Sequence, residues 1–166
     1  MPFLARHACN NDAMTARVIE GIDGIKALIG EHLGYSDYIE ITQERVNLFA
    51  EATGDFQWIH VDVERANRES PFGGPVAHGY LTLSLGPVLY PQVVAFKGFA
   101  LGVNYGANKI RFMSPVPVGA QLRLGVKLLA AEEIKGGVQS TLEFVFETEG
   151  ATKPSCVAEI IFRSYL

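Results

Sequence analysis

Hydrophobic side chains recur at helical spacing in two segments of the first third of the chain. Between Gly21 and Leu33 they return every three or four residues, which predicts a helix that ends at Gly34; its apolar face holds Ile22, Ile25, Leu28, Ile29 and Leu33. A short strand is expected over residues 38–41. Thr42 can then cap a second helix over residues 43–53, whose inward face consists of Val46, Phe49 and Ala50.

The most apolar stretch lies in the middle of the chain. Asp62 is placed to cap a short polar helix, VERANRES, and the sequence PFGGP that follows cannot be helical. From Val76 to about Val93 almost every residue is apolar or small, although Pro87 and Pro91 interrupt the run. We expect a buried central helix there of about 11 to 14 residues, roughly 16–21 Å at 1.5 Å per residue. A helix that is apolar nearly all round must be wrapped by other elements.

The last third of the chain reads as β-strands. Four segments rich in Val, Ile, Leu and Phe are separated by the turn sequences PVPVG, KGG and ATKP; they are Lys109–Met113, Gln121–Ile134, Gly137–Glu147 and Ser155–Tyr165. Alternation of apolar and polar residues is clearest in TLEFVFE, and it suits an antiparallel sheet with one packed and one solvated face.

These elements predict an α+β fold in which the long apolar helix lies across the inner face of the antiparallel sheet. No internal repeat or interdomain linker is visible, so we expect one domain over residues 21–166. The NND cluster near the start of the chain indicates that residues 1–20 form a poorly structured N-terminal arm.

Composition narrows the functional classes. The 166 residues are 48% hydrophobic and 19% charged, with a net charge of −4, so the chain has no general attraction to nucleic acids or anionic membranes. We expect neither as a partner. The two cysteines, Cys9 and Cys156, have no metal-ligand spacing and are expected to be reduced thiols, which favours a reducing, cytoplasmic location.

The candidate chemistry lies between Phe49 and Gly86. Asp55 follows the expected helix end at Gly54, and His60 follows five residues later across what we expect to be a loop. An imidazole is suited to proton transfer near neutral pH, and a nearby carboxylate can share that task. On local sequence alone, however, Asp55 could equally be a turn residue and His60 a hydrogen-bonded core histidine.

Three ordered blocks resemble the MaoC-like dehydratases of the hot dog fold, and in particular their nodulation-protein-N-like branch; these blocks are FAEATGDFQWIHVD, GGPVAHGYLTLSL and IRFMSPVPVGAQL. The resemblance implies a curved antiparallel sheet wrapped around a central helix. It also implies a homodimer, or a higher homo-oligomer, that acts on acyl thioesters of coenzyme A.

The activity implied by this resemblance is that of a lyase, an R-specific enoyl-CoA hydratase or dehydratase. It adds water reversibly, in the syn sense, to a trans-2-enoyl-CoA and forms an (R)-3-hydroxyacyl-CoA. Asp55 would activate the water, His60 would share that water and relay a proton, and the N–H of Gly79 would hold the thioester oxygen. Gln57 and His78 would have supporting roles, with His78 more a structural residue than a proton donor.

Other residues in or near these blocks are polar, charged or aromatic. Gln57 and Trp58 replace the Asn and Pro of typical R-specific hydratases. Lys109 and Arg111 share one face of a predicted strand and are candidate contacts for the phosphates or pantetheine of coenzyme A, although a solvated strand face is the default. Helix capping explains Asp62 better than a site role does.

We expect no metal site and no cofactor, since coenzyme A enters as part of the substrate. Two alternatives remain open. A carboxylate on the same fold could direct water to the thioester carbonyl, which would make the protein an acyl-CoA thioesterase. The Gln57-Trp58 departures also leave room for a non-catalytic hot dog protein that binds acyl-CoA.

Overall fold

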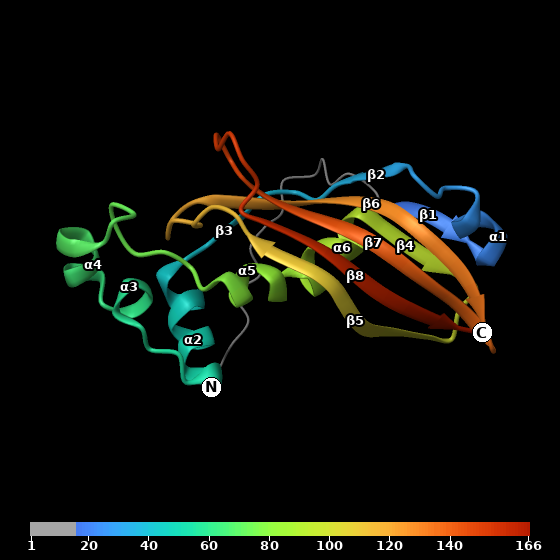
Figure 1. Cartoon of the computed structure of the whole chain (residues 1–166), viewed down its shortest axis with the longest axis horizontal. Helices are drawn as coiled ribbons and strands as arrows, with labels where there is room; N and C mark the ends of the chain where they lie inside the picture. Colours follow the sequence, from blue (N-terminus) through green and yellow to red (C-terminus); the bar gives the residue numbers. More distant parts are fainter. Residues whose placement is uncertain (1–15) are drawn as a thin grey trace, which may run out of the picture.

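The computed structural model describes residues 16–166, which form an antiparallel sheet curved around a central helical segment (Figure 1). The helices are α1 (Gly21–Lys26), α2 (Gln43–Thr53), α3 (Trp58–Val61), α4 (Val63–Glu69), α5 (Gly79–Ser84) and α6 (Gly86–Val93). The strands are β1 (Arg17–Glu20), β2 (His32–Tyr35), β3 (Ile39–Glu40), β4 (Val94–Lys97), β5 (Leu101–Phe112), β6 (Gln121–Ile134), β7 (Gly137–Thr148) and β8 (Cys156–Tyr165). The predicted α+β architecture is confirmed.

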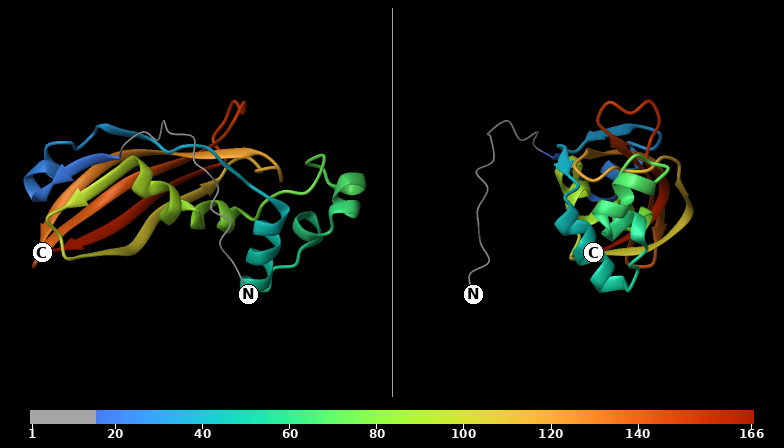
Figure 2. Two further views of the ribbon diagram at one scale, coloured as in Figure 1. Left: turned by 180° about the vertical axis from the view of Figure 1, so that it is seen from behind. Right: turned by 90° about the vertical axis from the view of Figure 1, so that its left-hand side faces the viewer.

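The main sheet has the order β2-β6-β7-β8-β5, with β3 pairing with the far end of β6. All of its pairings are antiparallel. Register shifts interrupt the β6–β7 pairing between Leu128 and Ala130 and the β5–β8 pairing at two places. Because such irregularities bend the strand that carries them, they help the sheet to curve around the helix. Figure 2 shows this curvature when the molecule is viewed end-on.

Helices α5 and α6 fill the concave side of the sheet. Their inward residues pack against alternate residues of β6, β7 and β8 in one core; it includes Leu81, Leu85, Leu89, Val93, Leu124, Val126, Leu142, Phe144 and Ile160. The predicted central helix is therefore present. It begins at Gly79 rather than Val76, because Val76 forms a bridge with Pro117.

The central helix is divided in two at Leu85. Pro87 has no backbone N–H to bond the preceding turn, and its ring crowds the carbonyl four residues earlier. The chain accommodates Pro87 by starting a new helix at Gly86, with Pro87 in its first turn. The helix is also not covered on all sides within one chain, since Tyr80 and Val88 are 66% and 53% exposed.

The first predicted helix is wrong in its second half. Helix α1 ends at Lys26, residues 27–30 form a turn, and residues 32–35 form strand β2 instead. Gly30 adopts a φ of 90° and donates its N–H to the Leu128 carbonyl, so the chain turns there and joins the edge of the sheet. The apolar spacing fitted a helix because Ile25 and Leu33 enter the same core from two different elements.

The two capped helices are confirmed. The Thr42 side chain accepts a hydrogen bond from the N–H of Arg45 at the start of α2, and the Asp62 side chain accepts one from the N–H of Arg65 at the start of α4. Strands β6, β7 and β8 match the predicted segments closely. Strand β5 is longer than predicted and begins at Leu101, while β4 was not predicted.

The N-terminal arm predicted over residues 1–20 lies mostly outside the described residues. Its end, Arg17–Glu20, forms β1, which pairs in parallel with β4. No helix in residues 16–166 is both long enough and apolar enough to cross a membrane.

Candidate functional site

Asp55 lies immediately beyond the end of α2. Gly54 adopts a left-handed φ of 75° and donates its N–H to the Ala50 carbonyl, which ends the helix as predicted and turns the chain. The Asp55 carboxylate accepts a hydrogen bond from the N–H of Gln57 at 3.3 Å. This short local turn presents an exposed Asp55 next to the start of α3.

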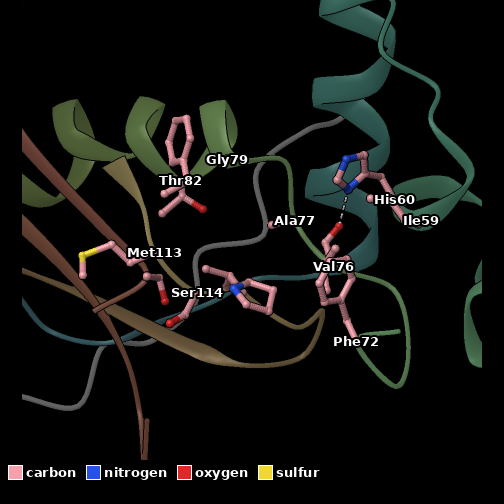
Figure 3. A pocket seen from close by; sticks show the side chains of 13 residues that line it. Ile59, His60, Phe72, Val76, Ala77, Gly79, Thr82, Met113 and Ser114 are labelled. Carbon is pink, nitrogen blue, oxygen red and sulfur yellow. Dashed lines mark hydrogen bonds between the residues drawn. The ribbon is translucent and has the colours of Figure 1, made fainter. Parts of the chain in front are cut away.

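His60 lies on the single-turn helix α3, so the expected loop between Asp55 and His60 is only partly correct. Its Nδ1 atom lies 2.6 Å from the carbonyl oxygen of Val76 (Figure 3). The backbone reinforces this link, because the N–H of Val76 donates to the Ile59 carbonyl and the Gln43 side chain donates to the His60 carbonyl. The position of His60 thus depends on segments before and after it in the chain.

The Val76 contact determines the tautomer of His60. A carbonyl oxygen only accepts hydrogen bonds, so Nδ1 must carry the hydrogen and Nε2 must be the unprotonated nitrogen of the neutral ring. The side chain is 7% exposed, and burial lowers the pKa of His60 below its ordinary 6.5. At neutral pH His60 is therefore a hydrogen-bond acceptor at Nε2.

His78 lies directly before α5 and packs flat against His60. The two ring centroids are 3.9 Å apart and the ring planes are inclined by 28°. The Nε2 atom of His78 lies 3.0 Å from the backbone carbonyl oxygen of Asp55, and the side chain is 3% exposed. The structure thus brings together three residues from the stretch that the sequence singled out.

Asp55, His60 and His78 each offer one metal-ligand atom, and these atoms lie within 4.8 Å of one another. Their orientation does not suit a metal ion. Imidazole lone pairs lie in the ring plane, and two stacked planes inclined by 28° meet far beyond the ~2.0–2.1 Å of a zinc–nitrogen bond. The arrangement instead suits the sharing of protons and hydrogen bonds.

A cavity of about 350 Å³ opens beside His60 (Figure 3). Its walls come from α3, the segment before α5, α5 itself, the end of β5 with the segment that follows it, and the residue before β8. They include Ile59, Phe72, Val76, Gly79, Thr82, Phe112, Met113, Ser114 and Ser155. The lining is mainly apolar, and its polar side chains are His60, Thr82, Ser114 and Ser155. Asp55 and His78 are not among the lining residues, although both lie beside His60. A cavity of this kind suits a ligand with one reactive polar group and an apolar body.

Gly79 opens helix α5 and lines this cavity. Its N–H lies in the first helical turn, where no intrahelical acceptor exists. A Cβ atom at this position would lie 2.9 Å from the Phe112 ring, so the glycine allows Phe112 to pack against the helix start. Gly79 therefore has a packing role beside any role in binding.

The other predicted residues lie further out. Gln57 is exposed and does not line the cavity, and Trp58 packs beneath the Arg65 guanidinium, 4.3 Å from the ring centroid. Lys109 and Arg111 are exposed on β5 and are also absent from the cavity lining. Lys109 forms an ion pair with Glu159 at 3.1 Å, and Arg111 donates to the Ile110 carbonyl.

Sequence reasoning gave no role to several cavity residues. Thr82 is buried one turn after Gly79 and donates its N–H to the His78 carbonyl, so the helical spacing from Gly79 could have identified it. Phe112, Met113 and Ser114 belong to the third sequence block, IRFMSPVPVGAQL, which supported the family resemblance without a role for each residue.

Comparison with known proteins agrees with this architecture. Residues 25–147 match the family described as MaoC like domain. The chain is 51% identical over 148 residues to 3-hydroxyacyl-thioester dehydratase Z of Mycobacterium tuberculosis, covering 89% of this chain and 97% of that protein. It is 40% identical over 140 residues to nodulation protein N of Rhizobium leguminosarum bv. viciae, covering 82% and 86%.

Among solved structures, the (R)-hydratase from A. caviae superposes with a TM-score of 0.66 and 26% identity, over 81% of this chain and 94% of that one. R-hydratase PhaJ1 from Pseudomonas aeruginosa superposes with a TM-score of 0.64 and 23% identity, over 82% and 81%. The predicted hot dog fold and the resemblance to nodulation protein N are confirmed. The chain belongs to the MaoC-like domain family.

Proposed function

We propose that this protein is a hydro-lyase that adds water reversibly to a trans-2-enoyl-CoA and forms an (R)-3-hydroxyacyl-CoA. The observation that carries this proposal is that His60, which is buried and unprotonated at Nε2, lines a mainly apolar cavity and lies in one cluster with Asp55. The 51% identity to a 3-hydroxyacyl-thioester dehydratase supports the reaction type, and the 26% identity to an (R)-hydratase supports the stereochemistry.

Asp55 and His60 are suited to hold one water molecule. An ionised carboxylate and an unprotonated imidazole nitrogen are both acceptors, so together they can take both hydrogens of a water and leave its lone pair free. As the water oxygen bonds to the β-carbon, the water loses a proton to this pair. Asp55 and His60 then return a proton to the α-carbon on the same face, which gives syn addition.

The charge that develops on the thioester oxygen needs a donor. Gly79 supplies an N–H without an intrahelical partner at the start of α5, and Gly79 lines the same cavity as His60. A donor aimed at a developing oxyanion typically contributes about 3–4 kcal/mol to the transition state. We assign this role to Gly79, while the Phe112 ring beside it forms part of the apolar wall.

Gln57, Lys109 and Arg111 act outside the cavity in this proposal. The Gln57 amide helps to orient the reactants from the edge of the Asp55 turn. Arg111 is exposed on β5 and does not line the cavity, and in this proposal its guanidinium meets the phosphates of coenzyme A outside the cavity. Lys109 lies two residues earlier on the strand, where Glu159 already offsets part of its charge.

A homodimer completes the proposal. Within residues 16–166, the 12-residue strand β5 pairs with β8 along one edge and with no strand along the other. Long free edges are normally covered by another strand. A second copy of the chain would also cover the exposed apolar residues of β5, of the residue after it and of the central helix; they are Leu101, Val103, Tyr105, Phe112, Met113, Tyr80 and Val88.

The proposed reaction uses no cofactor, and the free thiol of Cys156 fits a cytoplasmic location.

The dimer is tested by molecular mass in solution. Val103→Lys would place like charges along the two paired β5 edges, and we expect it to convert the dimer to a monomer. Val18→Lys is the matched control, because Val18 is exposed on β1, outside the main sheet. A wild-type protein that is already monomeric would contradict the proposed pairing.

The reaction is tested with crotonyl-CoA and a medium-chain trans-2-enoyl-CoA. We expect loss of the enoyl absorbance and formation of the (R)-3-hydroxyacyl product by chiral analysis. Asp55→Asn and His60→Ala should each lower kcat by about 10²–10⁴-fold while each variant still unfolds cooperatively. Release of free coenzyme A would indicate a thioesterase instead. Tight binding of the thioester without turnover would indicate a non-catalytic acyl-CoA-binding protein.

A further inference from the structure

His78 has more contacts within the site than the proposed reaction requires. It touches Asp55 through a hydrogen bond, touches His60 through its ring face, and precedes Gly79 in the chain. We propose that His78 is a positioning residue that holds Asp55 and His60 against the start of α5, so that both face one water. This inference rests on the proposed hydratase function.

The hydrogen bond to Asp55 is the first part of this role. Asp55 and His78 are 23 residues apart, and the bond joins the turn after α2 to the start of α5. The Asp55 carbonyl can only accept, so His78 Nε2 carries the hydrogen. His78 is itself fixed to α5, because its own carbonyl accepts the N–H of Thr82 at 3.1 Å. Movement of Asp55 relative to Gly79 would break this chain of bonds.

The ring contact with His60 is the second part. The imidazole of His78 lies between the His60 ring, at 3.9 Å, and the Phe49 ring, at 5.0 Å. The three rings limit rotation of His60 about its side-chain bonds, and the Nδ1 contact with Val76 sets its tautomer. Together these contacts aim the unprotonated Nε2 of His60 in one direction.

The protons of the two rings indicate that His78 does not itself transfer a proton. Its Nε2–H is already given to the Asp55 carbonyl, and its Nδ1 atom is buried without a hydrogen-bond partner in residues 16–166. The N–H of His78 is thus committed to this bond, whereas the Nε2 atom of His60 is free to accept a proton, so we assign the proton transfer to His60.

The charges around His60 agree with this division. Two titratable side chains face it: Asp55, from the turn before α3, and His78, from the segment before α5. The remaining cavity lining is apolar or carries hydroxyl groups. Burial is the main cause of the lowered pKa of His60 and His78 lowers it further, while the hydrogen bond to the Val76 carbonyl and, less strongly, Asp55 oppose the shift.

Two substitutions separate the parts of this role. His78→Ala removes the hydrogen bond and the ring, and we expect kcat to fall about tenfold or more while KM changes less than about twofold. His78→Gln can keep an N–H donor near Nε2, and we expect it to recover most of kcat. In both variants the fall of kcat/KM on the acid side, its acid limb, should move to higher pH, because both remove the His78 ring, which helps to bury His60 and lowers its pKa.

Thermal unfolding shows whether each variant is folded, and His78→Gln serves if His78→Ala is not. An unchanged kcat and an unchanged pH profile in a folded variant would overturn the proposal. Equal loss in both variants with no shift of the acid limb would indicate proton transfer by His78, which also overturns it.

The pKa of His60 can also be measured directly by NMR titration of its ring, which does not depend on catalytic activity. A raised His60 pKa in His78→Gln supports the positioning role even if the wild type fails to hydrate enoyl-CoA, whereas an unmoved pKa in an active wild type refutes it.

Discussion

The Nδ1 atom of His60 lies 2.6 Å from the backbone carbonyl oxygen of Val76, 16 residues further along the chain. This contact leaves Nε2 as the nitrogen that can accept a proton. It also means that the catalytic state proposed for His60 is the neutral one. The pH dependence of the reaction should therefore report the protonation of this ring.

We expect kcat/KM to fall on the acid side with an apparent pKa below 6.5. Burial lowers the pKa of His60, so a more acidic solution is needed to protonate Nε2 than for a histidine in water. The measurement is kcat/KM for crotonyl-CoA between about pH 4.5 and 8. An acid limb above 6.5 would contradict the assignment of neutral His60 as the acceptor.

Gly79→Ala should lower kcat, by up to about 10²-fold. The added Cβ would lie 2.9 Å from the Phe112 ring, so the ring or the start of α5 must move beside the proposed oxyanion donor. Gly86→Ala is the matched control, because its Cβ would lie 3.1 Å from the Phe144 ring, deeper in the core. That variant should lose stability but keep kcat for crotonyl-CoA. Equal effects of the two substitutions on kcat would argue against Gly79.

Gly106→Leu should reduce activity toward long acyl chains only. A second cavity of about 400 Å³ lies between the central helix and β5, lined by Leu83, Gly86, Pro87, Asn104, Gly106 and Phe162. Gly79, Leu83, Gly86 and Pro87 follow one another along the same helical segment, so a chain held at Gly79 can extend toward this space.

Each buried methylene contributes about 0.8 kcal/mol, or roughly fourfold in kcat/KM. Filling the second cavity should therefore lower kcat/KM for a dodecenoyl thioester several-fold per lost methylene contact. Crotonyl-CoA is the internal control and should react as before. A uniform loss with both substrates would show that Gly106 acts through the fold rather than through the acyl chain.

Local sequence predicted those parts of the site that local chemistry determines. Thr42 and Gly54 begin and end α2, and together they place Asp55. The family blocks pointed to His60 and Gly79. The contacts of His60 with Val76 and of His78 with Asp55 had no such signal, since they join residues 16 and 23 positions apart through the fold.

The missed part of β5 has a different cause. Residues 101–108 contain Gly102, Asn104 and Gly106, and most of the strand is exposed on both faces. A strand whose packing partner lies outside the chain lacks the alternation that one buried face imposes. The absence of a pattern in β5 and its free edge thus have the same explanation in the proposed dimer.

Cys156 should be unreactive in the folded protein. Its side chain is fully buried on β8, and burial raises the pKa of the thiol to about 11, so almost no thiolate exists near neutral pH. Cys9 lies outside the described residues, so the measurement uses Cys9→Ser, in which Cys156 is the remaining cysteine. We expect no reaction with a thiol reagent at pH 8 until denaturant is added. Rapid labelling of the native variant would show that the core around β8 opens.

Asp62→Ala should destabilise the fold without affecting the chemistry. The Asp62 carboxylate accepts the N–H of Arg65 at 3.0 Å and caps α4, and it is absent from both the His60 cavity and the cluster of Asp55, His60 and His78. Loss of such a cap typically costs about 1 kcal/mol of unfolding free energy. Asp62→Asn should restore most of that loss, because an amide oxygen also caps a helix. Both variants should keep the wild-type kcat for crotonyl-CoA, and a fall in kcat with Asp62→Asn would make this carboxylate a second acid of the site.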